Sequence, residues 1–287
     1  MTVAETVKHI IDRLSPVAAT PGEARVMAGM IMESLKGYSA TDLIIKADSP
    51  VSDYITTKVD EVVERLLRHE PIQYITGYTT FYGLKLAVNR SVLIPRPETT
   101  ELVEMIIGEW GNKSDLRVAD LCSGSGCIAL ALARNLPFSR VTAVELSDGA
   151  IEVIRENARA LKCNINIVKG DVLKMALPYS PQYDIIVSNP PYVLESERLE
   201  MEANVLDYEP EMALFVPDDD PLRFYKAINR YAAAALREGG KIYYELNPLE
   251  ADRLAADMRN EGWDDVEITL DISRRKRFLS ATRSSAQ

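Results

Sequence analysis

Hydrophobic residues recur at intervals of three and four positions through residues 6–68. Examples are Val7, Ile10, Ile11 and Leu14 near the start, Val26, Met27, Met30 and Ile31 in the middle, and Val59, Val62, Val63 and Leu66 near the end. This spacing places apolar side chains on one face of a helix, and no sustained strand-like alternation interrupts it. Pro16, Pro21 and Pro50 each follow a capping residue, which suits the first turn of a new helix. The pattern predicts a small helical-bundle domain over residues 1–72.

The pattern changes after Pro71, where β-favouring residues follow one another between turn residues. They are Tyr74, Ile75, Tyr78, Phe81, Tyr82, Leu84, Leu86, Val88, Val92 and Ile94, interrupted by Gly77, Gly83 and the pair Asn89-Arg90. Short runs of this kind predict a β-hairpin. We expect the hairpin to act as a linker over residues 73–95.

From residue 96 onward, apolar runs alternate with helical stretches. Strands are expected near 118–122, 141–146, 165–168, 185–188, 241–246, 266–270 and 277–281, and helices near 127–135, 148–161 and 222–236. Apolar strands that alternate with helices form a mostly parallel sheet covered on both faces. We therefore expect an α/β domain with a mostly parallel seven-stranded sheet over residues 96–287, with a frayed tail at 282–287.

The composition is that of a globular chain. The 287 residues are 47% hydrophobic and 26% charged, which fits about two domains and excludes a disordered, collagen-like or coiled-coil protein. The formal net charge of −10 disfavours binding to a polyphosphate backbone. We therefore expect no stable nucleic-acid partner.

Several kinds of site are not predicted. No apolar run approaches the roughly 18 to 20 residues that cross a bilayer, and charges interrupt the N-terminal segment, so neither a membrane span nor a secretory signal is expected. Cys122, Cys127 and Cys163 form no CxxC pair, and His9 and His69 are the only histidines. Neither a disulfide framework, a metal site nor a Ser-His-Asp triad is therefore expected. We expect a cytoplasmic protein.

A glycine-rich turn lies where the first strand of the expected sheet meets a helix. Its sequence is Asp120-Leu121-Cys122-Ser123-Gly124-Ser125-Gly126. Glycines let the backbone approach a ligand closely, and the N–H groups of the following helix point at that ligand. Ala129 satisfies the third position of the dinucleotide fingerprint. By itself the turn is therefore compatible with a nicotinamide cofactor, or with a plain connection between strand and helix.

Two acids follow at the ends of the next two strands. Glu145, nineteen residues after Gly126, is placed to accept hydrogen bonds from the hydroxyls of an adenosine ribose. Asp171, with Val172 beside it, is placed to accept from the adenine amino group. Each acid alone is equally typical of a helix cap. Together with the turn that begins at Asp120, they resemble the class I S-adenosylmethionine-dependent methyltransferases, which implies a Rossmann-like fold and S-adenosylmethionine as cofactor, with S-adenosylhomocysteine as product.

The segment Asn189-Pro190-Pro191-Tyr192 follows the fourth expected strand, beside the point where open α/β sheets bind ligands. The prolines stiffen the chain and leave carbonyl oxygens free to accept. We expect the side-chain oxygen of Asn189 and the carbonyl of Pro190 to accept the two hydrogens of a planar amide or amine, and Tyr192 to stack on that group. A proline-stiffened turn is the alternative, but it explains neither the Asn nor the Tyr. The segment resembles the motif of methyltransferases that modify planar nitrogen, in bases or in glutamine.

Further segments separate these two substrates. They are Pro71-Ile72-Gln73-Tyr74-Ile75-Thr76-Gly77, Phe81-Tyr82-Gly83, Val92-Leu93-Ile94-Pro95-Arg96-Pro97-Glu98-Thr99, and Tyr208-Glu209-Pro210 before Ala213-Leu214. Over nearly the whole chain they resemble the PrmC/HemK family, the protein-(glutamine-N(5)) methyltransferases of peptide-chain release factors. The resemblance implies methyl transfer to the glutamine of the Gly-Gly-Gln motif of bacterial class I release factors, which the helical domain would help to recognise. We expect a monomer.

The resemblance also implies a role for each matching residue. Asp120, Cys122, Ser123, Gly124, Ser125, Gly126, Glu145, Asp171, Val172 and Asn189 would bind the cofactor, with Pro97 and Thr99 in the wall over it. Asn189, Pro190, Pro191 and Tyr192 would hold the substrate glutamine, and Asn189, Pro190 and Tyr192 would be the catalytic residues. Arg96 would lie at the entrance for the substrate loop.

Three positions depart from the family pattern. Thr100 replaces a second acid, Asn247-Pro248-Leu249 replaces a segment that contains glycine, and Arg274 stands where glycine is common. We expect the first to affect the entrance and the other two to lie away from the chemistry.

Two other functions are weighed against this one. An N(6)-adenine or N(4)-cytosine DNA methyltransferase shares the 189–192 motif and flips its base into the pocket. The net charge disfavours it, and the most compact basic cluster, residues 274–277, is short and typical of a solvated strand edge. A non-catalytic binder with a relic site is disfavoured by the intact turn, Glu145 and the 189–192 motif.

For the reaction we expect direct in-line transfer, without a covalent enzyme intermediate or a dedicated general base. Positioning and hydrogen-bond polarisation of an amide nitrogen are sufficient for most of the catalysis. No histidine lies in the motif region. Cys127 is expected to be a buried helix residue rather than a reactive thiol.

Overall fold

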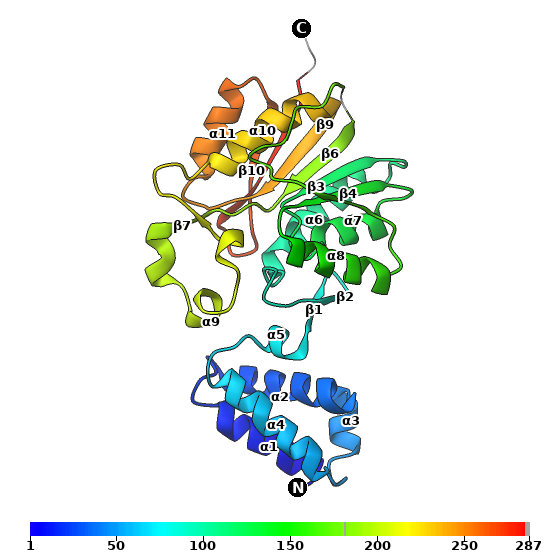
Figure 1. Cartoon of the computed structure of the whole chain (residues 1–287), viewed down its shortest axis with the longest axis vertical. Coiled ribbons are helices and arrows are strands. Elements are labelled where there is room, and N and C mark those ends of the chain that lie inside the picture. Colours follow the sequence, from blue (N-terminus) through cyan, green and yellow to red (C-terminus); the bar gives the residue numbers. More distant parts are fainter. Residues whose placement is uncertain (181, 285–287) are drawn as a thin grey trace. The chain divides into compact units, whose positions relative to one another are not determined.

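Two compact units make up the part of the chain that the structure describes, residues 1–180 and 182–284 (Figure 1). In this computed structural model, Met1–Tyr78 and Glu202–Tyr208 belong to the first unit. Thr79–Met201 and the described residues from Glu209 onward form the second. A short stretch from the middle of the α/β part of the sequence thus belongs to the helical unit.

Helices form the first unit. They are α1 (Val3–Leu14), α2 (Pro21–Lys36), α3 (Ala40–Ile45), α4 (Asp53–Leu66), α5 (Ile72–Thr76) and the short α9 (Ala203–Leu206). The first four begin at the hydroxyl residues Thr2, Thr20, Ser39 and Ser52, each of which accepts a hydrogen bond from the backbone N–H three residues later. Ile10, Leu14, Val59 and Val63 are buried in the shared core, as their spacing predicts. The predicted helical bundle is confirmed.

The hairpin is shorter than predicted. Its strands are β1 (Tyr78–Phe81) and β2 (Leu84–Ala87), and the turn residues Tyr82 and Gly83 both have positive φ, as a two-residue hairpin turn requires. The prediction was wrong for Tyr74 and Ile75, which lie in α5 because Ile72 and Ile75 pack into the helical core. Burial there outweighs their β propensity.

The end of β2 is fixed by a side chain. The amide of Asn157 accepts from the backbone N–H of Ala87 (2.6 Å) and donates to its carbonyl (3.1 Å), so it occupies the position of a third strand. Val92 and Ile94, which were predicted to continue the hairpin, therefore lie in an irregular segment instead.

A seven-stranded sheet forms the centre of the second unit. Its strands follow the spatial order β10 (Asp264–Leu270), β11 (Lys276–Thr282), β9 (Leu236–Glu245), β6 (Tyr183–Ser188), β3 (Arg117–Leu121), β4 (Arg140–Glu145) and β5 (Asn166–Lys169). The strands from β9 to β5 are parallel, and β11 is antiparallel to both of its neighbours. The predicted mostly parallel sheet is confirmed. The chain extends from β3 to β4 and β5 on one side and then returns to β6 on the other, which makes the β3/β6 boundary the switch point.

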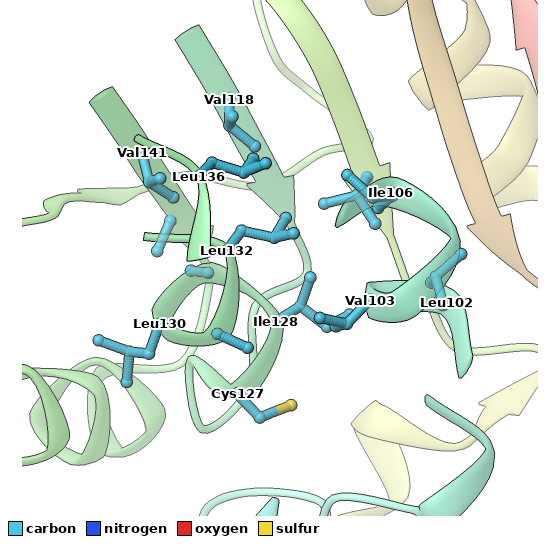
Figure 2. Packing of buried hydrophobic residues seen from close by; sticks show 14 of the residues in the cluster. Leu102, Val103, Ile106, Val118, Cys127, Ile128, Leu130, Leu132, Leu136 and Val141 are labelled. Atoms are coloured by element: carbon cyan, nitrogen blue, oxygen red, sulfur yellow. The ribbon is translucent and has the colours of Figure 1, made fainter. Parts of the chain in front are cut away.

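Helices cover both faces of this sheet. On one face lie α6 (Pro97–Trp110), α7 (Cys127–Asn135) and α8 (Asp148–Ala160), and on the other lie α10 (Arg223–Ala235) and α11 (Ala251–Asn260). Alternate residues of β6 face opposite cores, with Ile185 and Val187 in the first and Ile186 in the second. Figure 2 shows the first core, where side chains of α6 and α7 pack together beside Val118 and Val141.

Two of these helices were absent from the sequence prediction, α6 and α11. The second carries a readable signal, because its buried residues Ala251, Leu254, Ala255 and Met258 have the spacing of a helix face. The many charged residues of α11 obscure that spacing, and the segment lies between two strongly predicted strands.

Short elements connect β6 to α10. They are β7 (Val193–Leu194), the 3₁₀ helix Glu195–Glu200, α9, the 3₁₀ helix Glu211–Ala213 and β8 (Phe215–Val216), and β7 pairs with β8. Among the residues that the structure describes, no helix has both the length and the apolar character to cross a membrane.

Candidate active site

A cavity of about 330 Å³ lies at the edge of the sheet where β3, β4, β5 and β6 end. The glycine turn, Glu145, Asp171 and Asn189 all contribute to its wall. Segments from elsewhere in the chain complete the wall, including residues 91–93, 95 and 96, and Phe215 with Phe224. The carboxyl ends of parallel strands meet at one edge of a sheet, so residues distant in sequence come together here.

The glycine turn adopts a conformation that its glycines make accessible. Gly124 and Gly126 have φ values of 55° and 80°, and Cys122 shares this left-handed region at 62°. A Cβ added to Gly126 would lie 3.1 Å from the side chain of Ile154. Asn157 donates to the carbonyl of Ser125 (3.0 Å), so the side chain that ends β2 also holds the turn.

Asp120 supports the turn from below and lies outside the cavity wall. It is fully buried, and it accepts from the Ser123 hydroxyl (2.5 Å) and from the backbone N–H of Ala129 (3.1 Å) through one oxygen. The other oxygen has no hydrogen-bond partner among the described residues. Burial raises the pKa of Asp120 to about 7, although both hydrogen bonds oppose this shift.

Glu145 and Asp171 both face the cavity. Glu145 accepts three backbone N–H groups, from Gly124 (2.8 Å), Leu146 (2.8 Å) and Ser147 (2.9 Å). Asp171 caps the turn that follows it by accepting from the backbone of Leu173 (3.0 Å). A carboxylate has about four acceptor sites, so each acid retains capacity for a ligand hydroxyl or amino group.

Asn189 is held through its amide nitrogen. That nitrogen donates to the hydroxyl of Thr99 (3.5 Å), and the hydroxyl itself donates to the carboxylate of Glu245 (2.7 Å). Asn189 and Thr99 both line the cavity, while Glu245 lies behind them at the end of β9. In this arrangement the side-chain oxygen of Asn189 remains available as an acceptor.

The rest of the 189–192 segment is divided between the cavity and the interior. Pro191 lines the cavity, but the cavity wall formed by the described residues includes neither Pro190 nor Tyr192. The hydroxyl of Tyr192 donates to Glu245 (3.0 Å), and burial together with that carboxylate raises the pKa of Tyr192. The expected stacking of Tyr192 on a substrate stays a prediction.

Arg96 lines the cavity and is bound to a residue that was not predicted as part of the site. It pairs with Glu209 (2.6 Å), whose side chain is 1% exposed and whose other oxygen accepts from the backbone of Ile94 (3.1 Å). Glu209 therefore attaches the segment before helix Glu211–Ala213 to the cavity wall. Of the neighbouring predicted residues, Thr99 lines the wall and Pro97 is exposed outside it.

Two predictions about distant residues were wrong. Asn247 does not lie away from the site, because its amide donates to the carbonyl of Tyr192 (3.2 Å) and to Glu197 (2.7 Å). The basic cluster 274–277 is not wholly solvated either. The Arg277 side chain is only 14% exposed and pairs with the buried Asp271 (3.2 Å).

The thiols at the site are held in their neutral form. Cys127 begins α7 and is buried in the first core, as predicted (Figure 2). Burial raises the pKa of Cys127 to about 12 and also raises that of Cys122. Both thiols therefore stay protonated near neutral pH and are poor nucleophiles.

The remaining predicted cofactor-binding residues lie either in the cavity wall or directly behind it. Ser123, Gly124, Ser125 and Val172 line the cavity, and Gly126 lies just behind them as the N-cap of α7. Sequence reasoning missed Glu209, Glu245, Asn247 and Asn157 as site residues. Two signals were available, namely the acid that ends the apolar run of β9 and the position of Glu209 in the Tyr208-Glu209-Pro210 segment.

Two family models match this chain. Residues 5–77 match the PrmC N-terminal domain, and residues 101–207 match the methyltransferase small domain. A release factor glutamine methyltransferase from Bacteroides thetaiotaomicron is 41% identical over 92% of this chain and 94% of its own length. One from Streptococcus pneumoniae is 42% identical over 78% and 79%. A solved methyltransferase from Pyrococcus furiosus shares the fold, with a TM-score of 0.53 and 16% identity over 77% of this chain and 98% of that one.

Proposed function

The chain belongs to the release factor glutamine methyltransferase family, and from this premise we propose that it transfers a methyl group from S-adenosylmethionine to the side-chain amide nitrogen of a glutamine in a peptide-chain release factor. The glutamine is that of the Gly-Gly-Gln motif. The observation that carries the proposal is the orientation of Asn189, whose NH₂ group is bound by Thr99 so that its oxygen can accept from an amide N–H.

The cavity residues fit the cofactor. Glu145 and Asp171 supply acceptors for ribose hydroxyls and for the adenine amino group, and the left-handed turn 122–126 lets the backbone approach closely. The two acids in the cavity wall, Glu145 and Asp171, suit a positively charged ligand. When bound, S-adenosylmethionine supplies a methyl group that a nitrogen nucleophile accepts, and S-adenosylhomocysteine is the product.

The chain's own residues orient the nucleophile. The side-chain oxygen of Asn189 and the backbone carbonyl of Pro190, which lies between the wall residues Asn189 and Pro191, would accept the two N–H groups of the glutamine amide and leave its nitrogen lone pair free for alkylation. Polarisation by these acceptors increases electron density on the nitrogen. The methylated amide then releases one N–H proton to water, so the reaction needs no dedicated base.

The first unit serves to bind the body of the release factor. A substrate held at two places has a higher effective concentration at the active site than a free peptide has. We expect a short Gly-Gly-Gln peptide to be methylated with a kcat/KM at least about 100-fold below that of the whole factor. Equal values for peptide and factor would remove this role from the helical unit.

The proposal is tested by transfer of a radiolabelled methyl group from S-adenosylmethionine to three acceptors. These are a purified release factor, the same factor with its Gly-Gly-Gln glutamine changed to alanine, and duplex DNA. Label on the unchanged factor alone is the expected result, and it identifies both the reaction and the acceptor residue. Label on DNA and none on the factor would contradict the proposal in favour of a base methyltransferase.

A further inference from the structure

Glu245 is a buried acid that the proposed reaction does not use directly. It ends β9 with 1% of its surface exposed, and it lies behind the cavity wall. Its two carboxylate oxygens accept from two hydroxyls of the site, that of Thr99 (2.7 Å) and that of Tyr192 (3.0 Å). One carboxylate therefore connects α6 to the 189–192 segment.

The chain of hydrogen bonds from Glu245 to Asn189 has a fixed direction. A threonine hydroxyl has a single proton, and Thr99 donates it to the carboxylate. Its lone pairs remain for Asn189, so only the NH₂ end of the Asn189 amide makes a favourable contact there. The oxygen end consequently faces away from Thr99.

We propose that Glu245 is a positioning residue that acts through Thr99 to set the orientation of the Asn189 amide. The inference rests on the proposed function, because it gives the Asn189 oxygen the task of accepting the substrate amide N–H. Without an acceptor at position 245, the Thr99 hydroxyl is free to rotate and donate to the Asn189 oxygen. The Asn189 amide then presents its NH₂ group to the substrate. That group offers two donors and no acceptor where the substrate N–H needs an acceptor.

The surroundings of Glu245 support its acceptor role. Burial raises the pKa of Glu245, while the hydroxyls of Thr99 and Tyr192 and the nearby Arg277 oppose that shift. Arg277 comes from β11 and is itself paired with Asp271. A largely buried cation near a buried carboxylate favours the ionised form, which accepts hydrogen bonds and donates none.

The test compares two replacements of Thr99 in methyl transfer to the release factor. Thr99→Val keeps the shape and removes the hydroxyl, and we expect kcat to fall about 10- to 100-fold while KM for S-adenosylmethionine changes less than about threefold. Thr99→Ser keeps the hydroxyl, and we expect it to retain kcat within about threefold. A fall in kcat at a nearly constant KM, together with the retained kcat of Thr99→Ser, distinguishes a positioning role from a purely structural one.

A matched control removes another buried hydroxyl between the same helix and the same strand. The hydroxyl of Tyr243 accepts from Trp110 (2.6 Å) at the far end of α6 and donates to Glu109 (2.6 Å). Tyr243→Phe is expected to lower the thermal unfolding midpoint and leave kcat unchanged. Glu245→Gln is the second variant, and we expect it to lower kcat as Thr99→Val does, because its NH₂ group permits the reversed bond direction.

Three outcomes would overturn the inference. They are wild-type kcat in Thr99→Val, an equal loss in the Val and Ser variants, or a raised KM for S-adenosylmethionine with unchanged kcat, which would make Thr99 a cofactor contact. If Glu245→Gln fails to fold in thermal unfolding, the Thr99 pair decides alone. A wild-type protein that labels no release factor contradicts the proposed function, whereas an active wild type with unaffected variants contradicts only this inference.

Discussion

The two ends of the cavity are built in different ways. The glycine turn is held mainly by its own neighbourhood, since Asp120 binds Ser123 and Ala129, and Glu145 at the end of the next strand binds Gly124. The 189–192 segment is held by residues far away in sequence. Thr99 lies 90 residues before Asn189, and Glu245 lies 53 residues after Tyr192.

This difference teaches where the specificity of the site resides. A turn that carries its own supports folds in the same way wherever a strand meets a helix, and it suits a cofactor common to many reactions. A segment supported by α6, β9 and the residues after β9 keeps its geometry only when the whole domain is assembled. We therefore expect changes at the first end to alter cofactor affinity and changes at the second to alter turnover.

The largest effect is expected for Asn189→Ala. The variant removes the acceptor for the substrate amide, so kcat should fall by about 100-fold or more while the Kd for S-adenosylmethionine stays within a few-fold of wild type. Radiolabel transfer and calorimetric titration measure the two quantities. Asn135→Ala, which removes an amide that donates to the Ala131 carbonyl within α7, is the control. Near wild-type turnover in Asn189→Ala would show that the segment does not hold the substrate.

Glu145→Ala should lower the affinity for the cofactor and leave turnover nearly unchanged. It removes one backbone hydrogen bond to Gly124 in the turn, two to the residues directly after β4, and the expected ribose acceptor, so the Kd for S-adenosylmethionine should rise about 10- to 100-fold. The kcat at saturating cofactor should change only a few-fold. Glu152→Ala, which removes an exposed acid paired with Arg155, is the control. A loss confined to kcat would contradict the expectation that the glycine-turn end of the cavity governs cofactor affinity.

The same difference decides what the sequence predicts. The turn, Glu145 and Asp171 were predictable, because each follows a strand whose apolar run is visible and the parallel topology brings strand ends together. Asn189 was predictable for the same reason. The acids and amides behind them were not, since nothing near Glu245 or Asn247 in sequence indicates that Thr99 or Tyr192 lies beside it in the fold.

Errors in the secondary structure have a similar cause. Tyr74 and Ile75 have strong β propensity, yet they form a helical turn because the helical core buries Ile72 and Ile75. Arg277 was taken with its basic neighbours as solvated, yet it lies in β11, between β10 and β9, where its side chain is only 14% exposed. Local patterns predict elements well, and partners distant in sequence decide the exceptions.

Asp120 gives a smaller effect that depends on pH. Its pKa of about 7 in the folded protein exceeds the ordinary value of 3.8, so the folded state holds this proton more tightly than the unfolded state. The stabilising contribution is complete below about pH 4 and is lost as pH rises to about 7, by at most about 1.4 kcal/mol per pH unit. Asp120→Asn keeps the neutral shape at every pH. Unfolding free energies should therefore favour the variant progressively more between pH 5 and pH 7 and by a constant amount above. A difference that is flat over this range would mean that the turn does not desolvate its acid.

The smallest effect compares two residues with the same strained backbone, one in the glycine turn and one far from the cavity. Cys122 in the glycine turn and Arg274 in the turn between β10 and β11 both have a φ of 62°, where glycine is favoured. Relief of that strain is partly offset by the greater freedom of glycine in the unfolded chain, so Arg274→Gly should stabilise the protein by at most about 1 kcal/mol. Arg274 is exposed and outside the cavity wall, and its replacement should leave both kinetic constants unchanged.

Cys122→Gly relieves the same strain at a residue that lines the cavity. It should therefore change KM for S-adenosylmethionine, and it should stabilise less than Arg274→Gly because the apolar contacts of its side chain are lost. Denaturant unfolding and steady-state kinetics on the two variants give both quantities. Equal kinetics in the two would mean that the side chain at position 122 does not contribute to cofactor binding, and that the strain there serves only the path of the chain from β3 into α7.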